Sequence, residues 1–241
     1  MLNSIFTFSS LLLAIATARP SGISQRTPGS GNLVPRACAT KAQKVDGVDT
    51  NGKGVMIHNA DSETRSFFMY DNSCDNVPSK YITISASGMG FIPFSAGFQG
   101  RVVRGTEELN LDGKSHRLGT WLELSLDSQG WAWGDVSLIR GCDGPVTLQA
   151  LDSSGIVRGF KDTSVLFDAP DNILYPKDSG VKVINATELE GSNPPVVIPA
   201  VANYLGSKLG YSMQYIDDFH ENPVITSTNG RFGATFYQGR P

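Results

Sequence analysis

The sequence has only three cysteines and three histidines among its 241 residues. It contains no CxxC pair and no His–Cys spacing, so a zinc site is not expected. It also lacks a basic run and a stripe of interleaved arginine and aromatic residues, which argues against nucleic acid as a partner and against a polybasic membrane contact. No G-x-S-x-G motif of a serine hydrolase occurs. We therefore expect neither a metal nor an organic cofactor.

Long hydrophobic runs are absent as well, and the one short run lies near the start. Residues 11–16 are apolar but too few to span a bilayer, and the small residues Ala16 and Ala18 suit signal peptidase. No Lys or Arg precedes the run, so the α-amino group supplies the only positive charge there. We predict a signal peptide over residues 1–18, the alternative being a buried segment of the fold. The expected location is secreted, extracellular or wall-associated, without membrane insertion.

The composition changes sharply over residues 19–36, where Gly, Pro, Ser, Arg and Thr dominate. Such a segment cannot bury enough apolar surface to offset its ordering entropy, so we predict a disordered stretch or a removed pro-segment. The mature chain then starts near Arg19 or near Ala37. Residues 37–241 are long enough for one domain of ordinary size.

Three cysteines leave one over if two of them pair in an oxidising compartment. We expect a disulfide between Cys74 and Cys142, because both lie within the strand-rich part of the sequence. Cys38 is then free or joined to another molecule. Asn185 opens an Asn-Ala-Thr sequon and is the predicted N-glycosylation site.

Short apolar stretches broken by turn residues run from about residue 54 to 151 and predict an all-β sandwich or barrel. The spacing of apolar residues over 198–209 predicts one short helix. Residues 228–231, with their Asn-Gly pair, predict a type I′ hairpin turn. A closing strand follows this turn.

Two predicted strands carry the candidate ligand-binding residues. Trp121 and Glu123 alternate with leucines in the first, and Trp133 and Asp135 alternate with apolar residues in the second. If both strands belong to one sheet, these side chains line a common outer surface. A tryptophan face stacks on the apolar side of a sugar ring, and carboxylates accept hydrogen bonds from its hydroxyl groups. The alternative is that the carboxylates are solvated and the tryptophans pack under loops.

The same region resembles thaumatin-like proteins. Residues 100–106 (GRVVRGT), 120–124 (TWLEL) and 134–141 (GDVSLIRG) follow the order of that family's stretches G-R-x-W-x-R-T, T-L-A-E-F and D-x-S-L-x-x-G-F-N. Residues 55–59 and 85–94 resemble the family's opening strand and its lead into the arginine motif. The resemblance therefore spans most of the predicted strand-rich region.

This resemblance implies a β-sandwich without a metal or organic cofactor. It also implies an acidic cleft of one Arg, one Glu and several Asp, which some members use for β-1,3-glucan binding or hydrolysis. By position, Arg104, Glu123 and Asp135 correspond to that set, whereas Arg140 occupies the place of a family acid and Asp143 is its expected substitute. The scarcity of cysteine implies that the family's disulfide-braced loop domain is missing, as in cysteine-poor members secreted by filamentous fungi.

Three functions follow as hypotheses. The first is a non-enzymatic protein that binds cell-wall polysaccharide (β-glucan) or a surface protein through Arg104, Trp121, Glu123, Trp133, Asp135 and Asp143. The second is a weak endo-β-1,3-glucanase with Glu123 as the acid and Asp135 as its partner. The third is a structural or antigenic wall protein cross-linked through Cys38. We favour binding, because the Arg140 cation would hold neighbouring carboxylates ionised and oppose a general-acid role.

Overall fold

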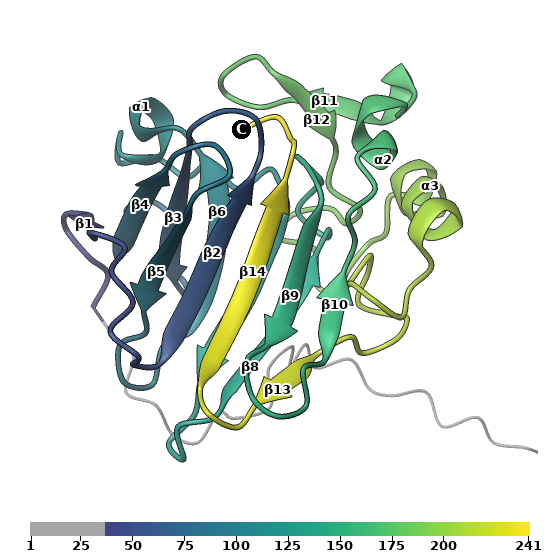
Figure 1. The fold of residues 1–241 in the computed structure, drawn as a ribbon. Helices are drawn as coiled ribbons and strands as arrows, with labels where there is room; N and C mark the ends of the chain where they lie inside the picture. Colours follow the sequence, from purple (N-terminus) through teal and green to yellow (C-terminus); the bar gives the residue numbers. More distant parts are fainter. Residues whose placement is uncertain (1–36) are drawn as a thin grey trace, which may run out of the picture.

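The computed structural model describes residues 37–241, so the predicted signal peptide and the segment 19–36 lie outside the described residues. Two β-sheets pack face to face, and a strand pair with short helices lies at one end (Figure 1). The predicted β-sandwich with a short helix is thereby confirmed. No helix of residues 37–241 is long and apolar enough to cross a membrane.

The first sheet has seven strands, which in spatial order are β1 (Gln43–Lys44), β4 (Lys80–Ile84), β3 (Arg65–Asp71), β6 (Gln99–Gly105), β7 (Trp121–Leu126), β8 (Ala132–Ser137) and β13 (Ile225–Ser227). All neighbours in this sheet are antiparallel except β1 and β4. The short helix α1 (Glu107–Asn110) directly follows β6, and the Thr106 side chain caps it by accepting from the Leu109 N–H.

The second sheet has five strands, in the order β10 (Val157–Gly159), β9 (Val146–Ala150), β14 (Arg231–Tyr237), β2 (Gly54–Ala60) and β5 (Met89–Pro93). The central strand β14 is the last in sequence, and it runs parallel to β2 along its whole length. Figure 1 shows this yellow strand lying beside the purple β2.

The main core lies between the two sheets and follows from period-2 alternation. Leu122 and Leu124 of β7 point inward, as predicted, and meet residues of the second sheet such as Phe232 and Phe236. At roughly 25 cal/mol per Å² of apolar surface removed from water, these side chains supply the main driving force for sheet packing.

A second apolar core lies beside the end of β8, where residues 160–216 pack together. Its elements are α2 (Ser164–Phe167), the 3₁₀ helix η1 (Asp171–Ile173), β11 (Leu174–Pro176), β12 (Lys182–Ile184) and α3 (Pro199–Leu209). The predicted helix is confirmed as α3. Pro199 opens it, and Gly210 follows it with a φ of 66°, a backbone conformation that glycine adopts without strain.

The disulfide prediction is wrong. Cys38 is bonded to Cys74, with 5.3 Å between the Cα atoms, and Cys142 is a free, buried cysteine. The Cys142 backbone forms an isolated β-bridge with Ile184 and the residue belongs to the second core, while its buried thiol lies beside Thr120 and Gly144. Burial raises the pKa of this thiol to about 12, which leaves it unreactive as a thiolate.

The predicted hairpin at residues 228–231 is also wrong. A tight turn is present, since the Gly230 N–H donates to the Ser227 carbonyl. The strands that flank it, however, belong to different sheets, because β13 pairs with β8 and β14 pairs with β2 and β9. Asn229 has no positive φ, as a type I′ turn would require.

Candidate functional site

The outer face of the seven-stranded sheet brings together the two predicted carboxylates. Glu123 of β7 lies directly opposite Asp135 of β8, and on its other side it lies opposite Arg101 of β6. Cβ atoms of such cross-strand pairs are about 4.5–5.5 Å apart, so the three groups form one row across the sheet. Glu123 is half-buried and Asp135 is buried.

Arg104 does not belong to this row, which corrects its predicted place beside Glu123. It is opposite Phe67 of β3, whose side chain belongs to the main core, so Arg104 lies on the inner face of β6. The cause is the period of the strand: residues 101 and 104 are an odd number of positions apart and must point to opposite faces. Sequence alternation identifies Arg101 as the outward arginine, a signal that motif matching missed.

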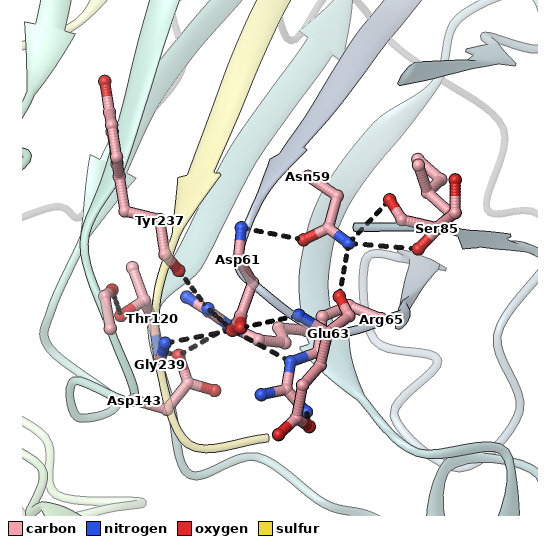
Figure 2. A network of polar contacts seen from close by, with 12 residues as sticks. Asn59, Asp61, Glu63, Arg65, Ser85, Thr120, Asp143, Tyr237 and Gly239 are labelled. Carbon is pink, nitrogen blue, oxygen red and sulfur yellow. Dashed lines mark hydrogen bonds and ion pairs between the residues drawn. The ribbon is translucent and has the colours of Figure 1, made fainter. Parts of the chain in front are cut away.

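Arg104 instead belongs to a buried network of charges at the end of the sandwich. Figure 2 shows the part of this network around Asp61, Asp143 and Tyr237. Its Nη1 donates to the Tyr237 carbonyl and lies 3.7 Å from Asp61 Oδ2, and its Nε lies 4.0 Å from Asp143 Oδ1. Gly144 packs against the guanidinium so closely that a Cβ on it would lie 2.6 Å from Nη2. Arg104 thus ties the C-terminal strand to the loops before β3 and β9.

Asp143 belongs to the same network and not to the row on the outer face. It is buried, and its carboxylate accepts from the Thr120 N–H (3.3 Å) and from Lys177 Nζ (3.0 Å). Both interactions fix the carboxylate in place as an internal counter-ion. The expectation that it joins Glu123 and Asp135 at a ligand is therefore not supported by the geometry.

Trp121 shares the outer face with Glu123 but does not offer a free ring to a ligand. Only 8% of the residue is exposed, and it packs in a small cluster with Phe68, Tyr70 and Val103. The Arg101 guanidinium lies over its ring at 4.1 Å, and its indole N–H donates to the Arg117 carbonyl at 2.9 Å. This matches the alternative in which a tryptophan packs under neighbouring groups.

Trp133 is better exposed and has a partner that the sequence reading missed, Trp131. The two tryptophans are two positions apart at the start of β8, and 39% of Trp131 is exposed. Asp127 holds both: its Oδ1 accepts from the Trp131 backbone N–H at 2.9 Å, and its Oδ2 accepts from the Trp133 indole N–H at 3.1 Å. We call Asp127, Trp131 and Trp133 the tryptophan platform.

The platform carboxylate is ionised under ordinary conditions. Partial desolvation opposes ionisation, but the hydrogen bonds from the Trp133 indole and from the backbone N–H groups of Trp131 and Gln129 outweigh it and lower the pKa of Asp127. An ionised Asp127 accepts all of these bonds at once. The Trp133 indole and the backbone of Trp131 are therefore held in place before any ligand arrives.

Two cavities open elsewhere on the part of the chain that the structure describes. One, of about 390 Å³, lies at the end of β6 near α1 and β11; the other, of about 640 Å³, lies over the outer face of the five-stranded sheet. Neither is lined by Glu123 or Asp135. Among residues 37–241, no group of three His, Cys, Asp or Glu side chains is arranged to hold a metal ion.

The predicted glycosylation site lies just after β12. Asn185 is half-buried, and its side-chain oxygen accepts from the Ala186 N–H. The sequon hydroxyl, from Thr187, is buried and donates to the Ile216 carbonyl. Glycosylation of Asn185 stays a prediction.

Comparisons with known proteins find matches among solved structures alone. No protein-family model matches the chain, and no curated protein matches it. Among solved structures, the chain is similar to the protein elicitor MoHrip2 from Magnaporthe oryzae, at 14% sequence identity and a TM-score of 0.37. This match covers 77% of the chain and 98% of MoHrip2.

Proposed function

We propose that this protein is a secreted, thaumatin-like protein that acts at a cell wall or host surface by binding β-glucan or another surface partner without catalysis. The observation that carries the proposal is the tryptophan platform, in which Asp127 accepts from the Trp133 indole and from the Trp131 backbone N–H, and in which Trp131 is well exposed. Exposed, pre-oriented indoles suit the apolar faces of sugar rings. The neighbouring Glu123 supplies hydrogen-bond acceptors for hydroxyl groups.

The absence of catalysis is supported by the position of the charged groups. A glycoside hydrolase needs its two carboxyl groups on either side of a bound sugar chain. Glu123 and Asp135 line neither cavity, and Arg104 and Asp143 face into a separate buried network. The cross-linked wall protein is less well supported, because Cys38 is already bonded to Cys74.

Weak endo-β-1,3-glucanase activity stays the second candidate, for one reason. Glu123 and Asp135 are direct cross-strand neighbours, and a separation of about 5–5.5 Å between carboxyl groups is typical of retaining enzymes. In that case Glu123 is the acid and Asp135 its partner.

The test is a pull-down of the purified mature protein on insoluble β-1,3-glucan, chitin and mannan, with soluble sugar measured in the same tubes. We expect retention on glucan without sugar release. Trp131→Ala and Trp133→Ala should each weaken retention by about tenfold or more, equivalent to ~1.4 kcal/mol. Phe219→Ala is the matched control, because Phe219 is an exposed aromatic residue that is not one of the platform residues.

Sugar release that Glu123→Gln abolishes would replace binding by the glucanase candidate. Retention that survives both tryptophan substitutions, or no retention on any of the three polysaccharides, would contradict the proposal and favour a protein partner.

A further inference from the structure

The cavity at the end of β6 is built from five separate stretches of chain. The end of β6 and α1 form one side, and Pro241 also lines it. His116 and Arg117 come from the loop between α1 and β7, Tyr175 and Asp178 from the β11–β12 region, and Glu190 from the segment after β12. Its volume of about 390 Å³ falls within the ~300–1,000 Å³ of small-molecule sites. It is thus large enough for one or two sugar rings and too small for a polymer segment of many residues.

His116 holds two of these stretches together. Its Nδ1 lies 2.5 Å from Asp178 Oδ2 and its Nε2 lies 3.0 Å from Asp112 Oδ1. Asp112 follows α1, whereas Asp178 lies in the turn between β11 and β12. The imidazole therefore closes one wall of the cavity and fixes the carboxylates on either side of it.

The lysine and arginine side chains that line the cavity have anionic neighbours. Arg117 is paired with Glu190, and Lys177 is paired with the buried Asp143 at 3.0 Å. The His116 ring lies between two carboxylates, those of Asp112 and Asp178. The cavity therefore offers no excess positive charge to an anionic ligand.

These paired groups still have hydrogen-bonding capacity. A guanidinium has five N–H donors, an ammonium three, and a carboxylate about four acceptor positions, so the pairs use only part of what they offer. The Ser115 and Thr106 side chains add hydroxyl groups to the lining. Tyr175, 56% exposed, presents an aromatic ring at the same cavity.

We propose that this cavity binds a small uncharged saccharide of one or two rings. Sugar hydroxyl groups donate and accept at the same time, which matches a lining of neutralised donors next to acceptors. The Tyr175 ring faces the apolar side of the sugar. This site is separate from the tryptophan platform, and the inference does not depend on the proposed glucan binding.

The proposal is tested by titrating the purified mature protein with three probes and monitoring binding by saturation-transfer NMR. The probes are D-glucose, its β-1,3-linked disaccharide and D-galacturonate. We expect the two neutral probes to bind and galacturonate to bind at least about tenfold more weakly. Tyr175→Ala and Asp178→Asn should each weaken binding of the neutral probes by at least about fivefold. Both residues are exposed, so these variants should fold.

Asp171→Asn is the matched control. Asp171 is a highly exposed aspartate in η1, just before β11, and it does not line the cavity. Its substitution should therefore leave binding unchanged. Retention on insoluble glucan is measured for all variants, because Tyr175→Ala should not affect it if the two sites are separate. The proposal would be overturned if galacturonate bound more tightly than the neutral probes or if the neutral probes did not bind. It would also be overturned if the Tyr175 and Asp178 variants bound the neutral probes as tightly as the unsubstituted protein.

Discussion

Two arginines of β6, three residues apart, show how one strand serves two different environments. Arg104 is sealed inside the sandwich and is stabilised by carboxylates, with Asp61 and Asp143 on either side. Arg101 lies on the outer face and is stabilised mainly by aromatic rings, since its guanidinium is 4.7 Å from the Tyr70 ring and 4.1 Å from the Trp121 ring.

The difference teaches what each arginine needs. Desolvation lowers the pKa of both, and nearby carboxylates oppose this shift in each case: Asp143 and Asp61 for Arg104, and Asp75 for Arg101. The Asp75 carboxylate lies 2.7 Å from Arg101, and Asp75 directly follows the disulfide-bonded Cys74. The inner arginine therefore depends on a charge network, and the outer one depends on stacking and on a stapled loop.

The largest effect is expected at the inner arginine. Arg104→Met should lower the free energy of unfolding by about 3–5 kcal/mol, because it leaves two buried carboxylates without their shared cation. Urea unfolding measures this. Arg158→Met, on the edge strand β10, is the control and should cost less than about 1 kcal/mol. A loss below about 1 kcal/mol for Arg104→Met would show that Arg65 and Lys177 alone neutralise the network.

Removal of the disulfide should have the next largest effect. The double substitution Cys38→Ser and Cys74→Ser should lower the free energy of unfolding by about 2–4 kcal/mol, since the bond closes a loop of 36 residues. Asp75, the partner of Arg101, directly follows Cys74, so a double-mutant cycle should show coupling of this change with Arg101→Ala. No coupling is expected with Arg104→Met. Equal coupling to both arginines would remove the distinction between them.

A smaller loss is expected from Arg101→Lys. Lysine keeps the positive charge but lacks the planar group that stacks between Tyr70 and Trp121, so we expect a cost of about 1–2 kcal/mol. Thermal unfolding followed by near-ultraviolet circular dichroism, which reports on Trp121, is the measurement. A lysine variant as stable as the wild type would mean that the contact with Asp75 is sufficient.

The smallest effect is a pH dependence that separates the two faces. Burial opposes ionisation of Asp61, but hydrogen bonds from Arg65 and from the Gly239 and Glu63 N–H groups outweigh it and hold its pKa below the ordinary 3.8. Its contribution is therefore fully present well above pH 3.8 and is lost as the pH falls through the lowered value. When the free energy of unfolding is measured against pH, Asp61→Asn should reduce the loss of stability at acidic pH. Arg101→Lys should leave this acidic loss unchanged.

Much of the fold follows from local alternation. The leucines of β7 occupy every second position, as do Phe232, Ala234 and Phe236 of β14, and the structure buries them in the main core. The same rule placed Glu123 and Asp135 on one outer face, and their strands are neighbours in one sheet. Because alternation is a property of each strand alone, it can be read without knowing the partner strands.

The sequence could not reveal which distant segments meet. Cys74 lies close to Cys38 in space, but neither composition nor spacing encodes that proximity, so membership of the strand-rich region pointed to the wrong partner. The turn at Thr228 has hairpin chemistry yet joins two sheets, since local turn geometry does not specify the pairing of its flanking strands. Arg104 was misplaced because a motif match ignored the face on which the strand presents each residue.

The position of β14 has a consequence for how the protein is made. This strand pairs with β2 from 177 residues earlier, and it separates β2 from β9 in the second sheet. During synthesis, β2 and β9 leave the ribosome before β14, the strand that pairs with both of them. The main core therefore stays partly uncovered until residues 231–237 emerge. Contacts so distant in sequence form slowly, which makes the nascent chain a substrate for chaperones during that interval.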